Sequence, residues 1–316
     1  MKGNNTQKNT NSFLGVPTPA KASGGIFTLA AIVPIFVSFV FIILISVMGL
    51  AKEGYDKTDW YLYVSYLMSP ISILMIAIIY FRFLNKPIVS VIKQQKCAAK
   101  YYIWALVLQA GLICLSLLTS WFLAWLEKFG YKLRVPNLPN MDGFGFVGAL
   151  FCIALLPAIF EELLFREMLL KGMGCFGTVG AALFCGGLFA LFHQNPAQTV
   201  YQFCCGVGFA LLAIRARSIL PTVVSHFINN ALIITLEKYR LTEFSLPVTL
   251  VIFCVSAVCL ALAVWYLVFR DKNTPWKEET LSAAEKGKER KTFWLFAAVG
   301  VLICALGFGM MLVKGF

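Results

Sequence analysis

The chain consists mainly of apolar segments long enough to cross a bilayer, separated by short polar intervals. A helix needs roughly 20 residues to span about 30 Å of hydrocarbon. Nine segments approach or exceed this length: Ile26 to Leu50, Trp60 to Phe83, Tyr102 to Leu126, Phe144 to Leu164, Val179 to Phe192, Thr199 to Ile214, Ile219 to Leu236, Leu246 to Phe269 and Phe293 to Val313. The sequence therefore predicts an all-α, polytopic transmembrane helical bundle with about eight to nine spans.

Composition supports this fold class, since 13% of the residues are charged against about 25% in soluble proteins. The polar residues 1–25 are expected to form a disordered cytoplasmic tail. The first apolar segment is too long for a signal-peptide core and should be retained as a span. We expect scaffold helices at 26–143, a central core at 144–236, and C-terminal helices with a basic cytoplasmic loop at 237–316.

Basic residues are distributed unevenly between the predicted loops. With the N-terminus in the cytoplasm and nine spans, the 27 Lys and Arg residues divide 19 to 8 in favour of the cytoplasmic side, as the positive-inside rule expects. The main clusters flank spans, which indicates attraction to anionic membrane lipids and not a nucleic-acid partner. We expect an integral protein of the bacterial cytoplasmic membrane.

Charged residues stand at the end of the fourth apolar segment, at Glu161 and Glu162, and just after it, at Arg166. A charge at membrane depth costs roughly 2.5 to 3.5 kcal/mol on insertion scales, which makes a functional role a reasonable hypothesis. Glu162 and Arg166 are four residues apart, the favourable spacing for a helical ion pair. Glu161 is rotated about 100° away and can face another partner. The alternative is a charge patch at the membrane boundary.

The only two histidines, His193 and His226, lie in the same part of the chain as the paired glutamates. His226 and Asn230 are four residues apart and share a helix face, so both can direct hydrogen-bonding groups to one point. Asn229 lies on another face and is expected to make helix contacts. The short fifth and sixth segments and two prolines, Pro157 and Pro196, suggest tilted or broken helices that bring His193 to the others.

These residues form an ordered set of motifs: Glu-Glu-x-x-x-Arg from Glu161, Phe-x-x-x-His ending at His193, and His-x-x-x-Asn at His226 and Asn230. The set resembles the CPBP family of CAAX proteases and bacteriocin-processing enzymes, which are described as intramembrane metalloproteases. The resemblance covers about 150–236. It implies that Glu161 and His193 activate water, and that His226 and Asn230 stabilise the oxyanion or assist at the water or metal site.

The expected function is therefore hydrolysis of a peptide bond in a membrane-associated peptide or protein. Glu161 would serve as the base, His193 would relay the proton, and Asn230 with His226 would stabilise the oxyanion. Zinc bound by Glu161, His193 and His226 is an open alternative, since catalytic zinc commonly takes three N or O ligands and a water. We expect a membrane-embedded polar cavity, filled with water and open to the cytoplasm.

Two other functions fit parts of this pattern. Buried glutamates and histidines also occur in proton- or ion-coupled transporters. A non-catalytic bacteriocin immunity protein could use the same fold. The zinc-protease motif H-E-x-x-H and a G-x-S-x-G serine motif are both absent from the sequence, so the motif set favours a protease of the CPBP type over the commoner classes.

Overall fold

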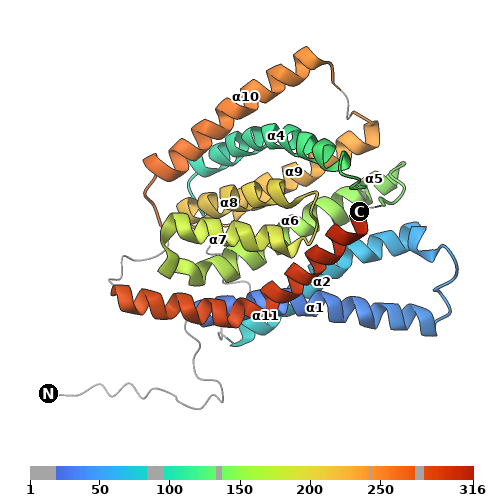
Figure 1. Ribbon diagram of the computed structural model, residues 1–316, viewed down its shortest axis with the longest axis horizontal. Coiled ribbons are helices and arrows are strands. Elements are labelled where there is room, and N and C mark those ends of the chain that lie inside the picture. Colours follow the sequence, from blue (N-terminus) through green and yellow to red (C-terminus); the bar gives the residue numbers. More distant parts are fainter. Residues whose placement is uncertain (1–18, 84–95, 133–136, 242–243, 275–280) are drawn as a thin grey trace.

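The described residues form an all-helical bundle, which confirms the predicted fold class. The structure is a computed structural model and describes residues 19–83, 96–132, 137–241, 244–274 and 281–316. No strand occurs within these ranges. Figure 1 shows the helices packed side by side, with α9 lying among α4, α6 and α8.

Ten α-helices are described: α1 (Pro19–Val47), α2 (Asp59–Phe83), α4 (Lys100–Glu127), α5 (Phe144–Ala149), α6 (Leu156–Glu162), α7 (Gly177–Phe192), α8 (Thr199–Ala216), α9 (Leu220–Tyr239), α10 (Leu246–Trp265) and α11 (Ala283–Gly315). Residues 19–25, assigned to the tail from sequence, form the first turns of α1. Gly24 lets α1 approach α11, because a Cβ there would lie 2.3 Å from the carbonyl oxygen of Phe293. The rest of the predicted tail lies outside the described residues.

Seven helical stretches of the described residues are long and apolar enough to cross a membrane: Pro19–Val47, Asp59–Arg82, Lys100–Glu127, Phe144–Phe192, Thr199–Ala216, Leu246–Arg270 and Ala283–Gly315. The difference from nine segments has two causes. The fourth and fifth segments belong to one helical run that reverses direction, and α9 is too polar to qualify. The outer helices present apolar side chains such as Phe36, Val255 and Leu295, as lipid contact requires.

The run from Phe144 to Phe192 departs from regular α-helix on both sides of α6. Leu150–Leu155 and Leu163–Leu169 are π-helical, and a 3₁₀ turn, Leu170–Phe176, leads into α7. Pro157 lies two residues after the end of the first π segment. Proline lacks the backbone N–H of a regular helix, and such a loss commonly coincides with irregular helix geometry. Gly177 reverses the chain with a φ of 72°, a left-handed conformation that glycine adopts without strain.

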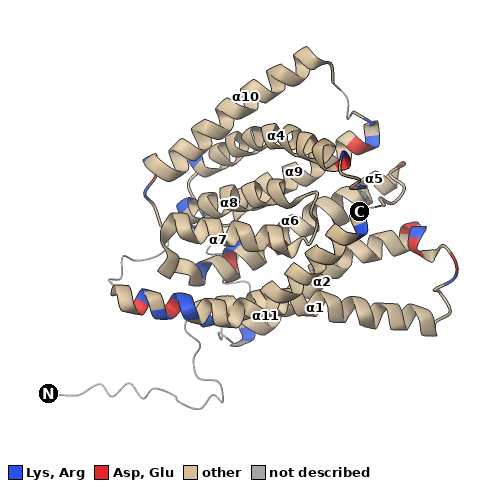
Figure 2. Cartoon of the chain, viewed as in Figure 1, with Lys and Arg blue, Asp and Glu red and all other residues tan. Residues whose placement is uncertain are grey.

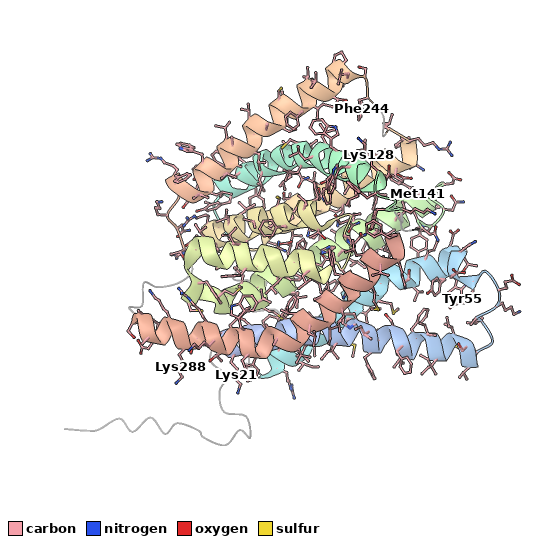
Figure 3. All side chains as sticks on the ribbon, viewed as in Figure 1. Lys21, Tyr55, Lys128, Met141, Phe244 and Lys288 are labelled. Atoms are coloured by element: carbon pink, nitrogen blue, oxygen red, sulfur yellow. The ribbon has the colours of Figure 1, made fainter. Side chains whose placement is uncertain are left out.

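Basic side chains concentrate at one end of the bundle, where α11 begins, on the left of Figure 2. Lys21 and Lys288 lie at this end, whereas Lys128 lies at the other (Figure 3). The orientation predicted from the sequence, with the N-terminus in the cytoplasm, would place this basic end on the cytoplasmic side.

Helices α7 and α8 cross at unusually short range through two glycines. A Cβ on Gly206 would lie 2.8 Å from the Cα of Gly186, and a Cβ on Gly186 would lie 2.7 Å from the backbone nitrogen of Val207. Small residues of this kind let membrane helices pack backbone against backbone.

Substitution Gly206→Ala should therefore push α7 and α8 apart and destabilise the protein by about 1–3 kcal/mol through overpacking. Gly187→Ala is the matched control, because a Cβ at Gly187 meets no atom within 4 Å. Thermal unfolding of both variants in detergent tests this. Equal midpoints for the two variants would show that the close approach is not required.

Asp271 fastens the end of α10 to the start of α4. Its carboxylate accepts hydrogen bonds from the Tyr101 hydroxyl at 2.9 Å and from Lys100 Nζ at 3.2 Å. Burial raises the pKa of Asp271, but these two donors and the backbone N–H of Asn273 lower it by more, so the net pKa falls below its ordinary 3.8. A carboxylate with a lowered pKa stabilises the fold above its ordinary pKa, and this stabilisation is lost as pH falls through the folded-state value.

We expect Asp271→Asn to cost about 1.5–3 kcal/mol at neutral pH, the usual worth of hydrogen bonds to a charged group. The difference from wild type should shrink below about pH 3.8, as the native carboxylate becomes protonated. Unfolding midpoints measured from pH 7 down to pH 3 give the comparison. A difference that persists undiminished at the lowest pH would mean that the charge of Asp271 is not what stabilises this junction.

Candidate active site

Glu161 and Glu162 occupy the last turn of α6, between the two π-helical segments. Both are buried: Glu161 is 9% exposed and Glu162 is 0% exposed. The Oε2 atom of Glu161 is inaccessible and makes no hydrogen bond to any described residue. A buried carboxylate oxygen without a partner is costly, so its position needs an explanation.

His193 follows the last residue of α7 and directs its ring toward Glu161. Its Nδ1 lies 2.8 Å from the carbonyl oxygen of Phe189, one turn earlier. Because a carbonyl only accepts, Nδ1 must carry the proton, and neutral His193 therefore presents the lone pair of Nε2. This Nε2 lies 3.9 Å from Glu161 Oε2.

His226 reaches the same oxygen from α9. Its Nδ1 lies 2.9 Å from Glu162 Oε1, and its Nε2 lies 3.9 Å from Glu161 Oε2. The Glu162 carboxylate accepts the Nδ1 proton, so neutral His226 also presents an Nε2 lone pair. One glutamate thus orients the histidine, while the other faces its free nitrogen.

Three proton-accepting groups therefore converge on one buried point: Glu161 Oε2, His193 Nε2 and His226 Nε2. The 3.9 Å separations are too long for direct hydrogen bonds and are within reach of a bridging water. The short α7 explains how His193 arrives there, since α7 ends at Phe192 and six residues separate it from α8. The expected juxtaposition of Glu161, His193 and His226 is thus present.

A buried ion pair is linked to this point through the hydrogen bond between Glu162 and His226. Arg166 Nη1 lies 2.8 Å from Glu162 Oε1 with both side chains fully buried, and Nη2 donates to the carbonyl of Gly206 at 3.2 Å. The guanidinium also lies 4.5 Å from the centre of the Phe189 ring and 5.5 Å from that of Phe209. The pair predicted from the four-residue spacing is therefore formed, and it joins α6 to α8.

Asn230 is half-buried on α9 and is joined to its neighbour, not to the three converging groups. The Nδ2 of Asn229 donates to the Oδ1 of Asn230 at 3.3 Å, which leaves the two N–H groups of Asn230 as its available donors. No hydrogen bond within the described residues links Asn230 to Glu161, His193 or His226.

A polar network beside Asn230 was not identified from the sequence. The Oδ1 of Asn229 accepts from Gln109 Nε2 at 3.0 Å and from the Tyr201 hydroxyl at 2.5 Å. Ser225 in turn donates to Gln109 Oε1 at 3.1 Å. The sequence could have pointed to this network, since Gln109 is the only Asn or Gln residue in the apolar segment from Tyr102 to Leu126. Asn229 makes helix contacts, as expected, through this network.

The network borders a cavity of about 350 Å³ between α4, α9 and the turn after α7. Its wall on α4 extends from Gln109 to Leu123, toward the end of α4 that is far from the basic end of the bundle. If the basic end is cytoplasmic, this cavity does not provide the predicted opening to the cytoplasm.

The segment that carries these groups has a recognised counterpart among protein families. Residues 143–232 match the family described as type II CAAX prenyl endopeptidase Rce1-like. Over these residues the chain is similar to CAAX proteases. No curated protein and no solved structure was found to match the chain. The resemblance read from the motifs is thereby confirmed, and the match supports an intramembrane endopeptidase in an integral membrane protein.

The Rce1-like segment contains side chains of the kind that bind zinc, namely two imidazoles and a carboxylate. However, no group of three or more His, Cys, Asp and Glu side chains in the described ranges is arranged so that it could hold a metal ion. Zinc binding by Glu161, His193 and His226 therefore stays a prediction, and the steps proposed for hydrolysis use the chain's own groups.

Replacing Arg166 by Met should leave Glu162 buried without its counter-charge and cost about 3–5 kcal/mol of stability. The double variant Glu162→Gln with Arg166→Met removes both charges and should recover part of that loss. Thermal unfolding of wild type, both single variants and the double variant measures the coupling between the two side chains. Purely additive effects would show that the two charges do not stabilise each other.

Proposed function

We propose that this protein is an intramembrane endopeptidase that cleaves a membrane-associated peptide or protein with a water molecule activated by Glu161 and His193. The observation that carries the proposal is the convergence of three acceptor atoms, one of them an unpartnered carboxylate oxygen, on a single buried point. A water molecule supplies the two O–H donors that such a point lacks.

In this proposal Glu161 Oε2 accepts one proton from the water while the other proton is held by His193 Nε2. The water oxygen then attacks the carbonyl carbon of the scissile bond, and negative charge develops on the carbonyl oxygen. When the C–N bond breaks, the proton on Glu161 passes to the departing amine, directly or through His193. Protons and electron pairs balance, and both side chains return to their starting state.

His226 and Asn230 are proposed to stabilise the developing oxyanion. Because His226 Nδ1 donates to Glu162, its Nε2 can donate to the oxyanion only in the imidazolium form. Asn230 can contribute N–H donors, because its Oδ1 is occupied by Asn229. Glu162 and Arg166 then act as positioning residues for His226.

The substrates we consider are leader peptides, signal peptides, bacteriocin precursors and CAAX-type proteins. All of them present a peptide bond at the membrane. The match to an endopeptidase family favours hydrolysis over transport or passive immunity.

Substitution Glu161→Gln should reduce kcat by at least 100-fold, because an amide cannot accept the proton of the water. His193→Ala should cause a comparable loss. Peptides released from cells that contain wild-type or Glu161→Gln protein would be compared by mass spectrometry, with and without a chelator. Leu118→Trp on the outer face of α4, 42% exposed, is the control. Unchanged cleavage in both active-site variants would refute the proposed activity.

A further inference from the structure

The residue that follows His193 has an unusual backbone conformation. Gln194 has a φ of 50°, in the left-handed region. Helices often end with a left-handed residue, but glycine usually occupies that position, because a residue with a Cβ is strained there. Strained residues persist where the surrounding structure holds them, and they are common at active sites. The conformation of Gln194 therefore directs attention to what holds it.

The side chain of Gln194 is held by α11. Its Nε2 lies 3.8 Å from Cys304 Sγ, a weak hydrogen bond to a thiol. A Cβ on Gly307 would lie 1.9 Å from Gln194 Oε1 and 2.6 Å from its Cδ. Cys304 and Gly307 are buried and three residues apart, so they share one face of α11. The missing side chain at Gly307 thus leaves the space that the Gln194 amide fills.

Helix α11 is in turn packed against α1 (Figure 1). A Cβ on Gly300 would lie 2.7 Å from the Cα of Thr28. Thr28 Oγ1 donates to the carbonyl oxygen of Phe296 at 2.6 Å and accepts from the Gly300 N–H at 3.2 Å. Backbone-to-backbone packing with hydrogen bonds between the helices holds α11 firmly. The position that receives the Gln194 amide is therefore well fixed.

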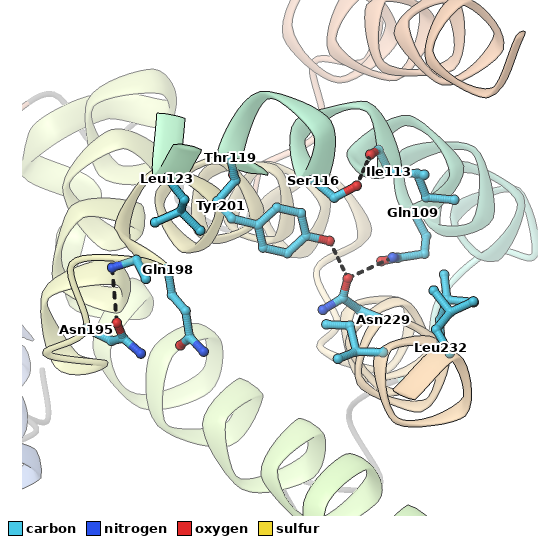
Figure 4. A pocket seen from close by; sticks show the side chains of 13 residues that line it. Gln109, Ile113, Ser116, Thr119, Leu123, Asn195, Gln198, Tyr201, Asn229 and Leu232 are labelled. Carbon is cyan, nitrogen blue, oxygen red and sulfur yellow. Dashed lines mark hydrogen bonds between the residues drawn. The ribbon is translucent and has the colours of Figure 1, made fainter. Parts of the chain in front are cut away.

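The backbone hydrogen bonds of the turn after His193 are local. The Gln194 N–H donates to the Leu191 carbonyl at 3.1 Å, and the Ala197 N–H donates to Asn195 Oδ1 at 3.0 Å (Figure 4). These bonds lie within the end of α7 and its turn, so they cannot fix the turn relative to other helices. The contact of the Gln194 side chain with α11 can.

We propose that Gln194 is a positioning residue for His193 and that α11 is the support that fixes it. His193 Nε2 lies 3.9 Å from Glu161 Oε2, a separation that suits one bridging water and would be lost if the turn moved. The inference rests on the proposed endopeptidase function. It adds to the site a helix, α11, that lies outside the residues 143–232 matched by the family.

Substitution Gly307→Ala places a methyl group where the Gln194 amide lies and should displace that side chain. Misplacing a reacting group by about 1 Å can cost roughly 100-fold in rate. We therefore expect the release of peptides that depend on Glu161, measured by mass spectrometry, to slow by about 10- to 100-fold. Gln194→Ala should slow it similarly. Gly309→Ala on the same helix is the matched control, because a Cβ there meets no atom within 4 Å.

A second readout does not require cleavage. The chain contains two histidines, His193 and His226, so NMR of full-length protein with isotope-labelled histidine in nanodiscs reports on both rings, with His193→Ala to assign them. Gly307→Ala and Gln194→Ala should shift or broaden the His193 signals and change those of His226 far less. Gly309→Ala should change neither. Equal changes in both rings would indicate a general loosening of the bundle and overturn the inference.

The double variant Gln194→Ala with Gly307→Ala tests whether the two residues act through one contact. If they do, adding Gly307→Ala to Gln194→Ala should slow peptide release no further. Additive losses would contradict the inference, and so would His193 signals that stay unchanged in both single variants.

The two readouts separate this inference from the proposed activity. If the His193 signals respond as expected but the wild-type protein releases no peptide, the activity fails and the positioning contact stands. If Glu161→Gln abolishes release while Gly307→Ala and Gln194→Ala change neither release nor the His193 signals, the activity stands and the positioning role of Gln194 is refuted.

Discussion

The ion pair between Glu162 and Arg166 is the constraint on which the site depends. Two charges without solvent exposure are costly unless each is well paired. Arg166 is paired with Glu162 and also contacts the Gly206 carbonyl and the face of Phe189, although its Nε and the Oε2 of Glu162 have no hydrogen-bond partner among the described residues. These partners belong to α6, α8 and α7, so the charge can be buried only if the three helices are assembled together.

The same pair determines how His226 is used. Since Glu162 is held by Arg166, its Oε1 accepts the Nδ1 proton of His226 and fixes which nitrogen faces Glu161. Glu161 has no comparable partner and keeps an oxygen available. Adjacent residues of one type thus take different roles, because a rotation of about 100° per residue places them against different neighbours.

Much of the site could be predicted from the sequence, because ionisable residues are rare in apolar segments and their positions stand out. The helical class, the Glu162–Arg166 pair and the grouping of Glu161 with both histidines were all predictable in this way. The π-helical segments were not, since α- and π-helices share the same apolar composition. The position of His193 near the other groups could be predicted from the short fifth segment. The network around Gln109 could not, because it depends on contacts between helices that are far apart in the sequence.

The two π-helical segments that flank α6 have a consequence for how this helix tolerates change. A π turn is usually equivalent to an α-helix with one extra residue inserted, so everything beyond it is rotated relative to the original frame. The direction in which the Glu161 side chain points therefore depends on the π-helical segment Leu150–Leu155. Deleting a single residue there would restore an unbroken α-helix and still leave an apolar span. Both carboxylates would then point in a new direction, so the length of this segment is constrained as strictly as the identity of its charged residues.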